Sequence, residues 1–315
     1  NMNSILEAIN EARTVLICGH IRPDGDCLGS AFALRDYCRE LGKSADACSP
    51  SPVPESYRFM AGSDEFNVLT CKSYDLFIAV DCASFDRIGR MEGYFRTAER
   101  TVCIDHHDGH DGFADINLVK SNASSTCEIV FDLLEPTGKI TRGIADSLYV
   151  GLSTDTGHFM HSNTDKKVLY TAYRLACLGA DCHGIATKLY RSRSRAKTML
   201  IAKSIEAMRF YMNGKVCIIP MTQQLLDECG ISSNDTEGII DYAISVNGVE
   251  VGVSMCAERE NEYKVSFRSR RRHVNDIAAV FGGGGHIYAA GCRIFGRTED
   301  VIDKILKAIR DTDVE

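Results

Sequence analysis

Short apolar runs in the first half of this chain end in carboxylates and imidazoles. The run at residues 15–18 leads to His20, Asp24 and Asp26, and carboxylates this close repel one another unless a cation lies between them. In an extended segment, Asp24 and Asp26 would face the same side. Oxygen ligands with one imidazole suit Mn²⁺ or Mg²⁺ better than a structural zinc. The alternative is a polar loop whose aspartates cap a helix beginning at residues 28–30.

Two further predicted strands, at residues 76–81 and 102–105, end in the same kinds of side chain. The residues are Asp81 for the first strand and Asp105, His106 and His107 for the second. Open α/β sheets bind their ligands at the carboxyl ends of parallel strands, which favours a shared site. The alternatives are a turn-forming role for Asp81 and a surface position for the two histidines.

A further carboxylate, Asp155, lies in a turn of small residues after a helix predicted at residues 144–152. Taken alone, it would be interpreted as a turn or helix-capping residue. With the strand ends, however, this region holds more carboxylates and imidazoles than one divalent ion requires. Two ions sharing a carboxylate stabilise the entering and leaving oxygens of phosphoryl transfer and bring the pKa of bound water near ~7. The pattern therefore indicates hydrolysis of a phosphate ester or anhydride.

The alternation of apolar runs with helical periodicity predicts an α/β fold in two domains. We expect a parallel sheet with flanking helices over residues 1–190, a linker and connecting helix over 191–211, and a smaller mixed α/β domain over 212–315, with a cleft between the domains. The connecting helix is predicted at residues 198–211, after the basic segment 190–195. The other predicted helices lie at residues 31–41, 126–134, 167–178, 276–281 and 299–309. The other predicted strands lie at residues 216–219, 249–256, 263–267 and 291–295.

Composition narrows the class of protein. No apolar run approaches the ~20 residues needed to span a bilayer, and the N-terminal residues do not resemble a signal peptide. The 14 cysteines include no C-x-x-C pair, so we expect buried free thiols in a reducing cytoplasm. A net charge of −7 argues against a protein that coats long nucleic acid, duplex included.

Two motifs in the second domain suit phosphate binding. Four arginines, Arg268 and residues 270–272, surround Ser269 after a predicted strand, and guanidinium groups bind phosphate oxygens well. Such a cluster is also typical of a solvated face. The run from Gly282 to Gly285 allows backbone N–H groups to wrap a phosphate oxygen, to which His286 would add a donor or a charge. A flexible loop is the alternative for the glycines.

The order of these motifs resembles the DHH phosphoesterase superfamily. It comprises His-x3-Asp-x-Asp, an aspartate closing a strand, Asp-His-His, Thr-Asp-Thr-Gly and a late Gly-Gly-Gly-Gly-His run, over almost the whole chain. The resemblance implies a ligand set for two metals. One metal would take His20 and Asp24, the other would take Asp26, His106 and Asp155, and Asp81 would bridge them. It further implies that Asp105 orients the imidazoles. His107 would face the scissile phosphate as electrophile or proton donor.

The chain length and the glycine–histidine run most resemble the nanoRNase-like group of this superfamily. That resemblance implies Mn²⁺-dependent, exonucleolytic hydrolysis of short oligoribonucleotides and removal of the 3′-phosphate of adenosine 3′,5′-bisphosphate. It implies substrate binding by the segment that contains Ser124 and Ser125, by Arg268 with Ser269, and by Gly283, Gly284, Gly285 and His286. For the two serines a capped helix is the alternative. A homodimer is compatible with the resemblance.

Three other functions stay open. The first is a phosphodiesterase for cyclic di-AMP or its linear dinucleotide product. The second is a nucleotide-binding module without catalysis. The third is a basic surface that docks long RNA through the arginine cluster, with binding that depends steeply on salt.

Overall fold

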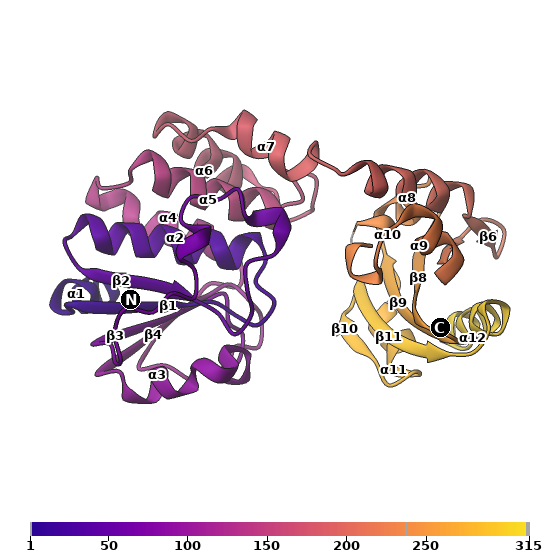
Figure 1. Ribbon diagram of the computed structural model, residues 1–315, viewed down its shortest axis with the longest axis horizontal. Coiled ribbons are helices and arrows are strands. Elements are labelled where there is room, and N and C mark those ends of the chain that lie inside the picture. Colours follow the sequence, from indigo (N-terminus) through magenta and orange to yellow (C-terminus); the bar gives the residue numbers. More distant parts are fainter. Residues whose placement is uncertain (1, 237, 313–315) are drawn as a thin grey trace. The chain divides into compact units, whose positions relative to one another are not determined.

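The computed structural model describes residues 2–236 and 238–312, apart from the side chains of Asn234 and His286. The chain divides into two compact units, Asn1–Ser192 and Arg193–Glu315 (Figure 1). In the part of the chain that is described, no helix has both the length and the apolar character that a membrane crossing requires.

The first unit is built on a parallel sheet, as predicted. Within the described residues its strands are β1 (Thr14–Cys18), β2 (Ser44–Cys48), β3 (Leu76–Val80), β4 (Arg100–Asp105) and β5 (Ile116–Val119). They lie in the order β2-β1-β3-β4-β5, and every pair is parallel. The order changes direction between β1 and β3. In sheets of this topology the carboxyl edge at that point is the usual ligand site.

Both faces of this sheet are covered. In β1, Val15 and Ile17 pack into one apolar core, whereas Leu16 and Cys18 pack into another, because alternate residues of a strand point to opposite faces. On the first face lie α1 (Met2–Glu11), α2 (Gly25–Glu40), α4 (Thr126–Leu134) and α5 (Arg142–Asp155), with α6 (Lys166–Cys177) and α7 (Cys182–Tyr190) packed on α5. On the second face lies α3 (Glu92–Thr97) with the residues before it (Figure 1).

Two glycines let α2 and α5 approach closely. A Cβ on Gly29 would lie 2.4 Å from the carbonyl oxygen of Ser147, and a Cβ on Gly151 would lie 2.2 Å from Cys127 Sγ. The same Cβ on Gly151 would lie 2.8 Å from an oxygen of Asp26. The close crossing therefore places Asp26, in the first turn of α2, directly against α5.

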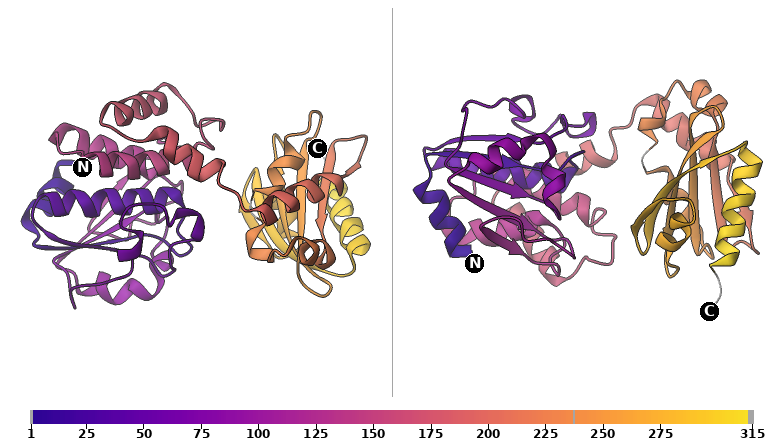
Figure 2. Two further views of the ribbon diagram at one scale, coloured as in Figure 1. Left: turned by 45° about the horizontal axis from the view of Figure 1, so that its top comes forward. Right: turned by 90° about the horizontal axis from the view of Figure 1, so that it is seen from below.

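The second unit is a mixed sheet between two layers of helices, which confirms the predicted mixed α/β class. In the described residues its strands are β6 (Arg209–Tyr211), β7 (Val216–Met221), β8 (Val251–Arg259), β9 (Glu262–Ser269), β10 (Gly284–His286) and β11 (Ala289–Phe295). Their order is β10-β11-β9-β8-β7-β6, with β7 and β8 parallel and the other neighbours antiparallel. Figure 2 shows this sheet in two further views. One face packs against α8 (Arg195–Glu206), α9 (Gln223–Cys229) and α10 (Ile239–Ile244); the other packs against α11 (Val274–Ala279) and α12 (Thr298–Asp311).

The helix predicted over residues 198–211 is wrong at its C-terminal end. Helix α8 ends at Glu206, and residues Arg209–Tyr211 form β6, which pairs with β7. Met212 and Asn213 adopt positive φ angles of 51° and 54°, so the chain reverses before Gly214. An Asn-Gly pair between two strands is a strong hairpin signal, and it prevails here over the helical pattern.

We expect Gly151→Ala to destabilise the first unit, because the new methyl group on α5 would contact Asp26 of α2 and Cys127 Sγ of α4. Overpacking of this kind costs about 1–3 kcal/mol of unfolding free energy. Gly143→Ala in the first turn of the same helix is the matched control, since a Cβ there meets nothing within 4 Å. Urea unfolding with chelator present measures both variants. Equal stability of the two would contradict the close crossing.

Candidate metal centre

The side chains predicted to bind metal gather at the carboxyl edge of the parallel sheet. His20 follows β1, Asp81 directly follows β3, and His106 directly follows β4. Strand β3 pairs with both β1 and β4, so the three strand ends are neighbours. The site therefore lies where the strand order changes direction.

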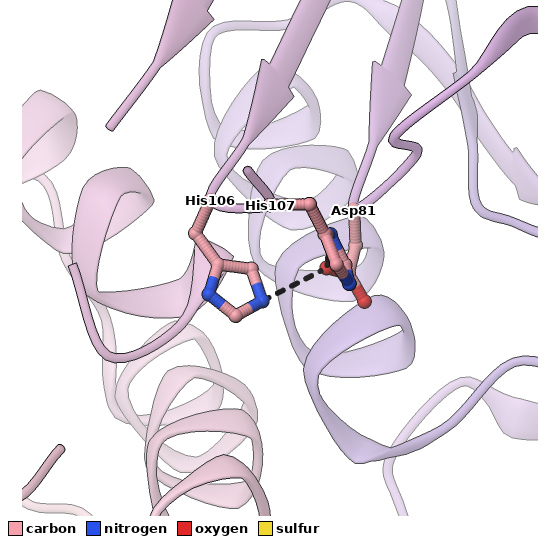
Figure 3. Close-up of side chains that lie close together, drawn as sticks. All are labelled: Asp81, His106 and His107. Atoms are coloured by element: carbon pink, nitrogen blue, oxygen red, sulfur yellow. Dashed lines mark ion pairs between the residues drawn. The ribbon is translucent and has the colours of Figure 1, made fainter. Parts of the chain in front are cut away.

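Asp81 is the centre of this cluster. Its carboxylate is buried; one oxygen, Oδ2, lies 3.3 Å from His20 Nε2, and the other, Oδ1, lies 3.5 Å from His106 Nε2 (Figure 3). Thr126 Oγ1 donates to Oδ1 at 3.1 Å. The backbone of Asp81 has a φ of 58°, a left-handed conformation that costs free energy in a non-glycine residue and concentrates at functional sites. Asp81 thus contacts possible ligand atoms through both oxygens; Asp81, His106 and His107 also form a group of their own, with His107 Nδ1 3.6 Å from Asp81 Oδ1.

The first group consists of His20, Asp24 and Asp81. His20 Nε2 lies 3.8 Å from Asp24 Oδ1, and His20 Nδ1 lies 2.8 Å from the carbonyl oxygen of Ile21. Nε2 is the ring nitrogen that faces the carboxylates of Asp24 and Asp81.

The second group consists of Asp26, His106 and Asp155. His106 Nε2 lies 3.8 Å from Asp26 Oδ2 and 3.3 Å from Asp155 Oδ2. Asp26 is fully buried, and its oxygens accept the backbone N–H groups of Thr126 (2.6 Å) and Cys127 (2.8 Å). These N–H groups open α4, where the helix dipole stabilises negative charge.

Three local expectations for these aspartates were wrong. Helix α2 begins at Gly25 rather than at residues 28–30, so Asp24 and Asp26 do not lie in one extended segment. Asp24 caps the helix by accepting the N–H of Cys27, and Asp26 lies in its first turn, so the two carboxylates serve different groups. Asp155 is the last residue of α5 and not part of the turn after it. Asp24 therefore caps a helix, as the alternative expected, and also lies in the cluster.

His107 is held by Asp105. Its Nδ1 lies 2.8 Å from Asp105 Oδ1, and its backbone N–H donates to the other oxygen of Asp105 at 3.3 Å. The hydrogen bond to Asp105 raises the pKa of His107 above its ordinary value. The predicted orienting role of Asp105 thus concerns His107, whereas His106 turns to the second group of ligands. The role of His107 toward a substrate stays a prediction.

Burial and mutual repulsion change the protonation of these acids. Burial, followed by the charge of Asp81, raises the pKa of Asp26 to about 7. Burial and then the charge of Asp26 also raise the pKa of Asp155. Burial lowers the pKa of His20, but its bonds to Asp24 and Asp81 outweigh that effect and raise it to about 10. Carboxylates and imidazoles of this kind fit divalent cations, which would replace the protons.

The hydroxyl groups of Ser124 and Ser125 form hydrogen bonds within the protein. The hydroxyl of Ser124 donates to Glu128 at 2.6 Å, and the hydroxyl of Ser125 caps α4 by accepting the N–H of Glu128. Both serines are buried. The arrangement is the capped helix given above as the alternative. It does not favour the predicted binding of substrate by these hydroxyls.

The arginine cluster of the second unit divides by its contacts. Ser269 Oγ accepts the backbone N–H groups of Arg271 and Arg272, so this predicted substrate ligand shapes the turn after β9. Arg272 lies 3.4 Å from Glu250, and Arg270 donates to the carbonyl oxygen of Ile244. Arg268 instead lines a pocket of about 280 Å³. The Arg268 guanidinium also donates to the carbonyl oxygen of Phe267 at 3.1 Å, and among the four arginines Arg268 is the one that lines this pocket.

The glycine run forms structure other than the expected phosphate loop. Gly284–His286 make up β10, an edge strand paired with β11, and the N–H of Gly283 donates to the carbonyl oxygen of Ala278. A Cβ on Gly283 would lie 2.2 Å from the carbonyl oxygen of Gly291, so glycine here permits a close approach of two backbones. The N–H of Gly283 is thus committed within the protein, and phosphate binding by the glycine run stays a prediction. The side chain of His286 lies outside the described residues.

Thr126 and Arg87 belong to the site, although the sequence analysis missed both. Thr126 contacts Asp81 through its hydroxyl and Asp26 through its N–H, and the guanidinium of Arg87 lies 3.0 Å from His20 Nδ1. Thr126 was predicted only as a helix start. The signal available for Thr126 was its position at the start of a predicted helix, directly after two serines. Arg87 stands in a segment without motif or periodicity, so no signal marked it.

Fold and cluster together define a phosphoesterase-type site on an α/β sheet, and the comparisons agree. Models of the DHH family, N-terminal domain, and of the DHHA1 domain match residues 14–152 and 213–312. The bifunctional oligoribonuclease and PAP phosphatase NrnA of Thermus thermophilus is 30% identical, over 94% of this chain and 89% of that protein. The NrnA protein of Bacillus subtilis is 25% identical, over 96% of this chain and 95% of that one. The chain belongs to the DHH family.

A solved structure has the same fold. The crystal structure of an exopolyphosphatase-related protein from Bacteroides fragilis superposes with a TM-score of 0.91 at 25% sequence identity. The match covers 98% of this chain and 95% of that one.

We expect the protein to bind two Mn²⁺ ions per chain and to release protons as it does so. A cation must displace the protons held by the raised pKa values of Asp26 and Asp155, so binding weakens as pH falls through about 7. Calorimetry at pH 8 and pH 6, in buffers of different ionisation enthalpy, measures both effects. Asp81→Asn should bind Mn²⁺ much more weakly, whereas the exposed Asp64→Asn should match the wild type. Binding without proton release, or unaffected by Asp81→Asn, would contradict the site.

Proposed function

We propose that this protein is a metal-dependent phosphoesterase that hydrolyses short oligoribonucleotides from one end and removes the 3′-phosphate of adenosine 3′,5′-bisphosphate. The observation that carries the proposal is the position of Asp81, whose two oxygens face two separate groups of carboxylates and imidazoles. The relatives named oligoribonuclease and PAP phosphatase, similar over nearly the whole chain, support these substrates.

We base the proposed ligand roles on two of these groups. His20, Asp24 and Asp81 would hold one cation; Asp26, His106 and Asp155 would hold the other, with Asp81 shared. Two divalent cations there would supply a nucleophile from water and stabilise the charge on the phosphoryl oxygens. We propose Mn²⁺ in preference to Mg²⁺, because imidazoles stand among the oxygen ligands and Mg²⁺ prefers oxygen alone.

His107 supplies acid catalysis in this proposal. The Asp105 carboxylate fixes Nδ1 and favours the protonated ring, so Nε2 carries a proton that can pass to the leaving oxygen. Asp105 is therefore a positioning residue. Arg268 would hold a phosphate of the substrate away from the bond that breaks, as a charge-assisted hydrogen-bond donor. The cleft between the units, the homodimer and the cytoplasmic location stay predictions.

Substrate turnover tests the proposal directly. We expect the wild type with Mn²⁺ to hydrolyse a labelled RNA dimer and trimer and adenosine 3′,5′-bisphosphate, and to act poorly on long RNA and on cyclic di-AMP. Preferred turnover of a cyclic or linear dinucleotide over the others would favour the phosphodiesterase alternative. Binding of nucleotides without turnover in any divalent metal would favour the binding module.

Asp81→Asn and Arg268→Ala should change different kinetic constants. Asp81→Asn removes the shared ligand, so kcat should fall to background for every substrate. Arg268→Ala removes one charged contact worth about 1.5–3 kcal/mol, so KM should rise about 10- to 100-fold with a smaller effect on kcat. The exposed Arg310→Ala on α12 is the control. An unchanged KM in Arg268→Ala would contradict the phosphate role, and an active Asp81→Asn would contradict the metal centre.

The pH profile tests the pair of His107 and Asp105. Loss of the carboxylate in Asp105→Asn should lower the pKa of His107, so the alkaline limb of kcat should move to lower pH. Loss of the carboxylate that positions this acid should reduce kcat, by no more than the about 10²- to 10⁴-fold that a general acid contributes. Asp108→Asn, in the exposed loop beyond His107, is the matched control. A lower kcat with an unmoved alkaline limb would show that His107 is not the proton donor.

A further inference from the structure

We propose that Tyr190 and His158 are positioning residues for Asp155. Through Asp155 they set the affinity of one of the two cations, the one that this aspartate would bind together with Asp26 and His106. The inference rests on the proposed function, in which Asp155 is a metal ligand. It goes beyond that function because it assigns control of one ion to two residues that lie outside the groups of ligand atoms.

Asp155 is the least constrained member of its group. Asp26 is fully buried and accepts two backbone N–H groups, and His106 directly follows a buried strand. Asp155 is the last residue of α5, and its side chain is 24% exposed. Within the described parts of the chain, its carboxylate has one polar contact within 3.5 Å, with His106 at 3.3 Å. Because helix ends fray, the position of this carboxylate depends on what holds the last turn of α5.

The last turn of α5 is closed by a strained backbone. The N–H of Gly157 donates to the carbonyl oxygen of Thr154 at 3.1 Å, and the N–H of His158 donates to that of Ser153 at 2.7 Å. These are the two hydrogen bonds of a Schellman motif. Gly157, His158 and Phe159 have positive φ angles of 55°, 55° and 66°. This conformation costs free energy in the two residues that are not glycine, so other contacts must hold the turn.

The side chains of His158 and Tyr190 supply such contacts. The hydroxyl of the buried Ser153 lies 3.0 Å from His158 Nδ1 and 3.1 Å from the hydroxyl of Tyr190. Tyr190 also donates to the carbonyl oxygen of Ser153 at 3.1 Å, and the centres of the Tyr190 and His158 rings lie 4.8 Å apart. Since Ser153 precedes Asp155 by two residues, this network holds the helical turn that carries the ligand.

Tyr190 reaches this turn from another helix. It is the last residue of α7, and the second unit begins at Arg193. The hydroxyl of Tyr190 therefore links the end of α7 to the end of α5. Replacing a residue that supports a metal ligand typically weakens metal binding by about 10- to 100-fold. Tyr190 acts through the backbone of α5 and not on the carboxylate itself, so we expect the lower end of that range.

The test measures the two Mn²⁺ dissociation constants of Tyr190→Phe, which loses the hydroxyl and keeps the ring. Titration with Mn²⁺, followed by the electron paramagnetic resonance signal of the free ion, gives both constants without substrate. Asp155→Asn and Asp24→Asn identify which constant belongs to which group of ligands. Tyr190→Phe should weaken only the ion that Asp155→Asn weakens, by about tenfold.

Two further variants complete this comparison. His158→Gly removes the ring but still permits the left-handed backbone, so it should weaken the same ion as Tyr190→Phe. Tyr170→Phe is the matched control, because Tyr170 is an exposed tyrosine on the neighbouring helix α6, and it should bind both ions as the wild type does. Circular dichroism with chelator present checks that each variant folds.

A double-mutant cycle shows whether Tyr190 acts through Asp155. Added to Asp155→Asn, Tyr190→Phe should weaken Mn²⁺ binding no further, because the carboxylate that it positions is gone. Equal weakening of both ions, an unchanged affinity in Tyr190→Phe and His158→Gly, or additive losses in the double variant would overturn the inference. If Asp155→Asn loses one ion while Tyr190→Phe keeps both affinities, this inference fails alone. If Asp155→Asn binds both ions normally, the proposed metal centre fails and this inference with it.

Discussion

Repulsion among carboxylates is the constraint on which this structure depends. Asp26, Asp81 and Asp155 come from α2, the end of β3 and the end of α5, and all of them lie within reach of His106. Burial strengthens their repulsion, as the raised pKa values of Asp26 and Asp155 indicate. A chain that folds this way needs protons or cations among these groups. A divalent cation is the partner that also supplies chemistry.

The surrounding fold offsets part of that cost before any ion binds. The first N–H groups of α4 point at Asp26, and the hydroxyl of Thr126 reaches Asp81. Gly29 and Gly151 let α2 and α5 cross closely enough for Asp26 and Asp155 to share one histidine. The strained backbone of Asp81 turns its carboxylate inward at the point where the strand order changes direction. Each feature is local, and together they hold the ligands at fixed positions.

Much of this centre could be predicted, because its residues follow apolar strands. A parallel strand that ends in Asp81 or in Asp105 must deliver that side chain to the carboxyl edge of the sheet, whatever the rest of the chain does. The residue at which helix α2 begins could not be predicted from the sequence. Whether Asp24 lies in an extended segment or caps a helix depends on where α2 begins, and that depends on its packing against α5.

The least predictable parts concern polar groups that serve the protein rather than a ligand. Ser125 and Ser269 carry the hydroxyls expected at an anion site, yet both complete backbone turns. The glycine run was expected to wrap a phosphate, yet Gly283 allows two backbones to approach and Gly284 opens an edge strand.

The central claim is that Asp81 is shared by two cations. Crystals of the protein soaked in Mn²⁺ and measured at the manganese absorption edge test it most directly. The account predicts two anomalous peaks, one beside His20 and Asp24, the other beside Asp26, His106 and Asp155, with a different oxygen of Asp81 directed at each. A single peak, or peaks away from Asp81, would contradict it.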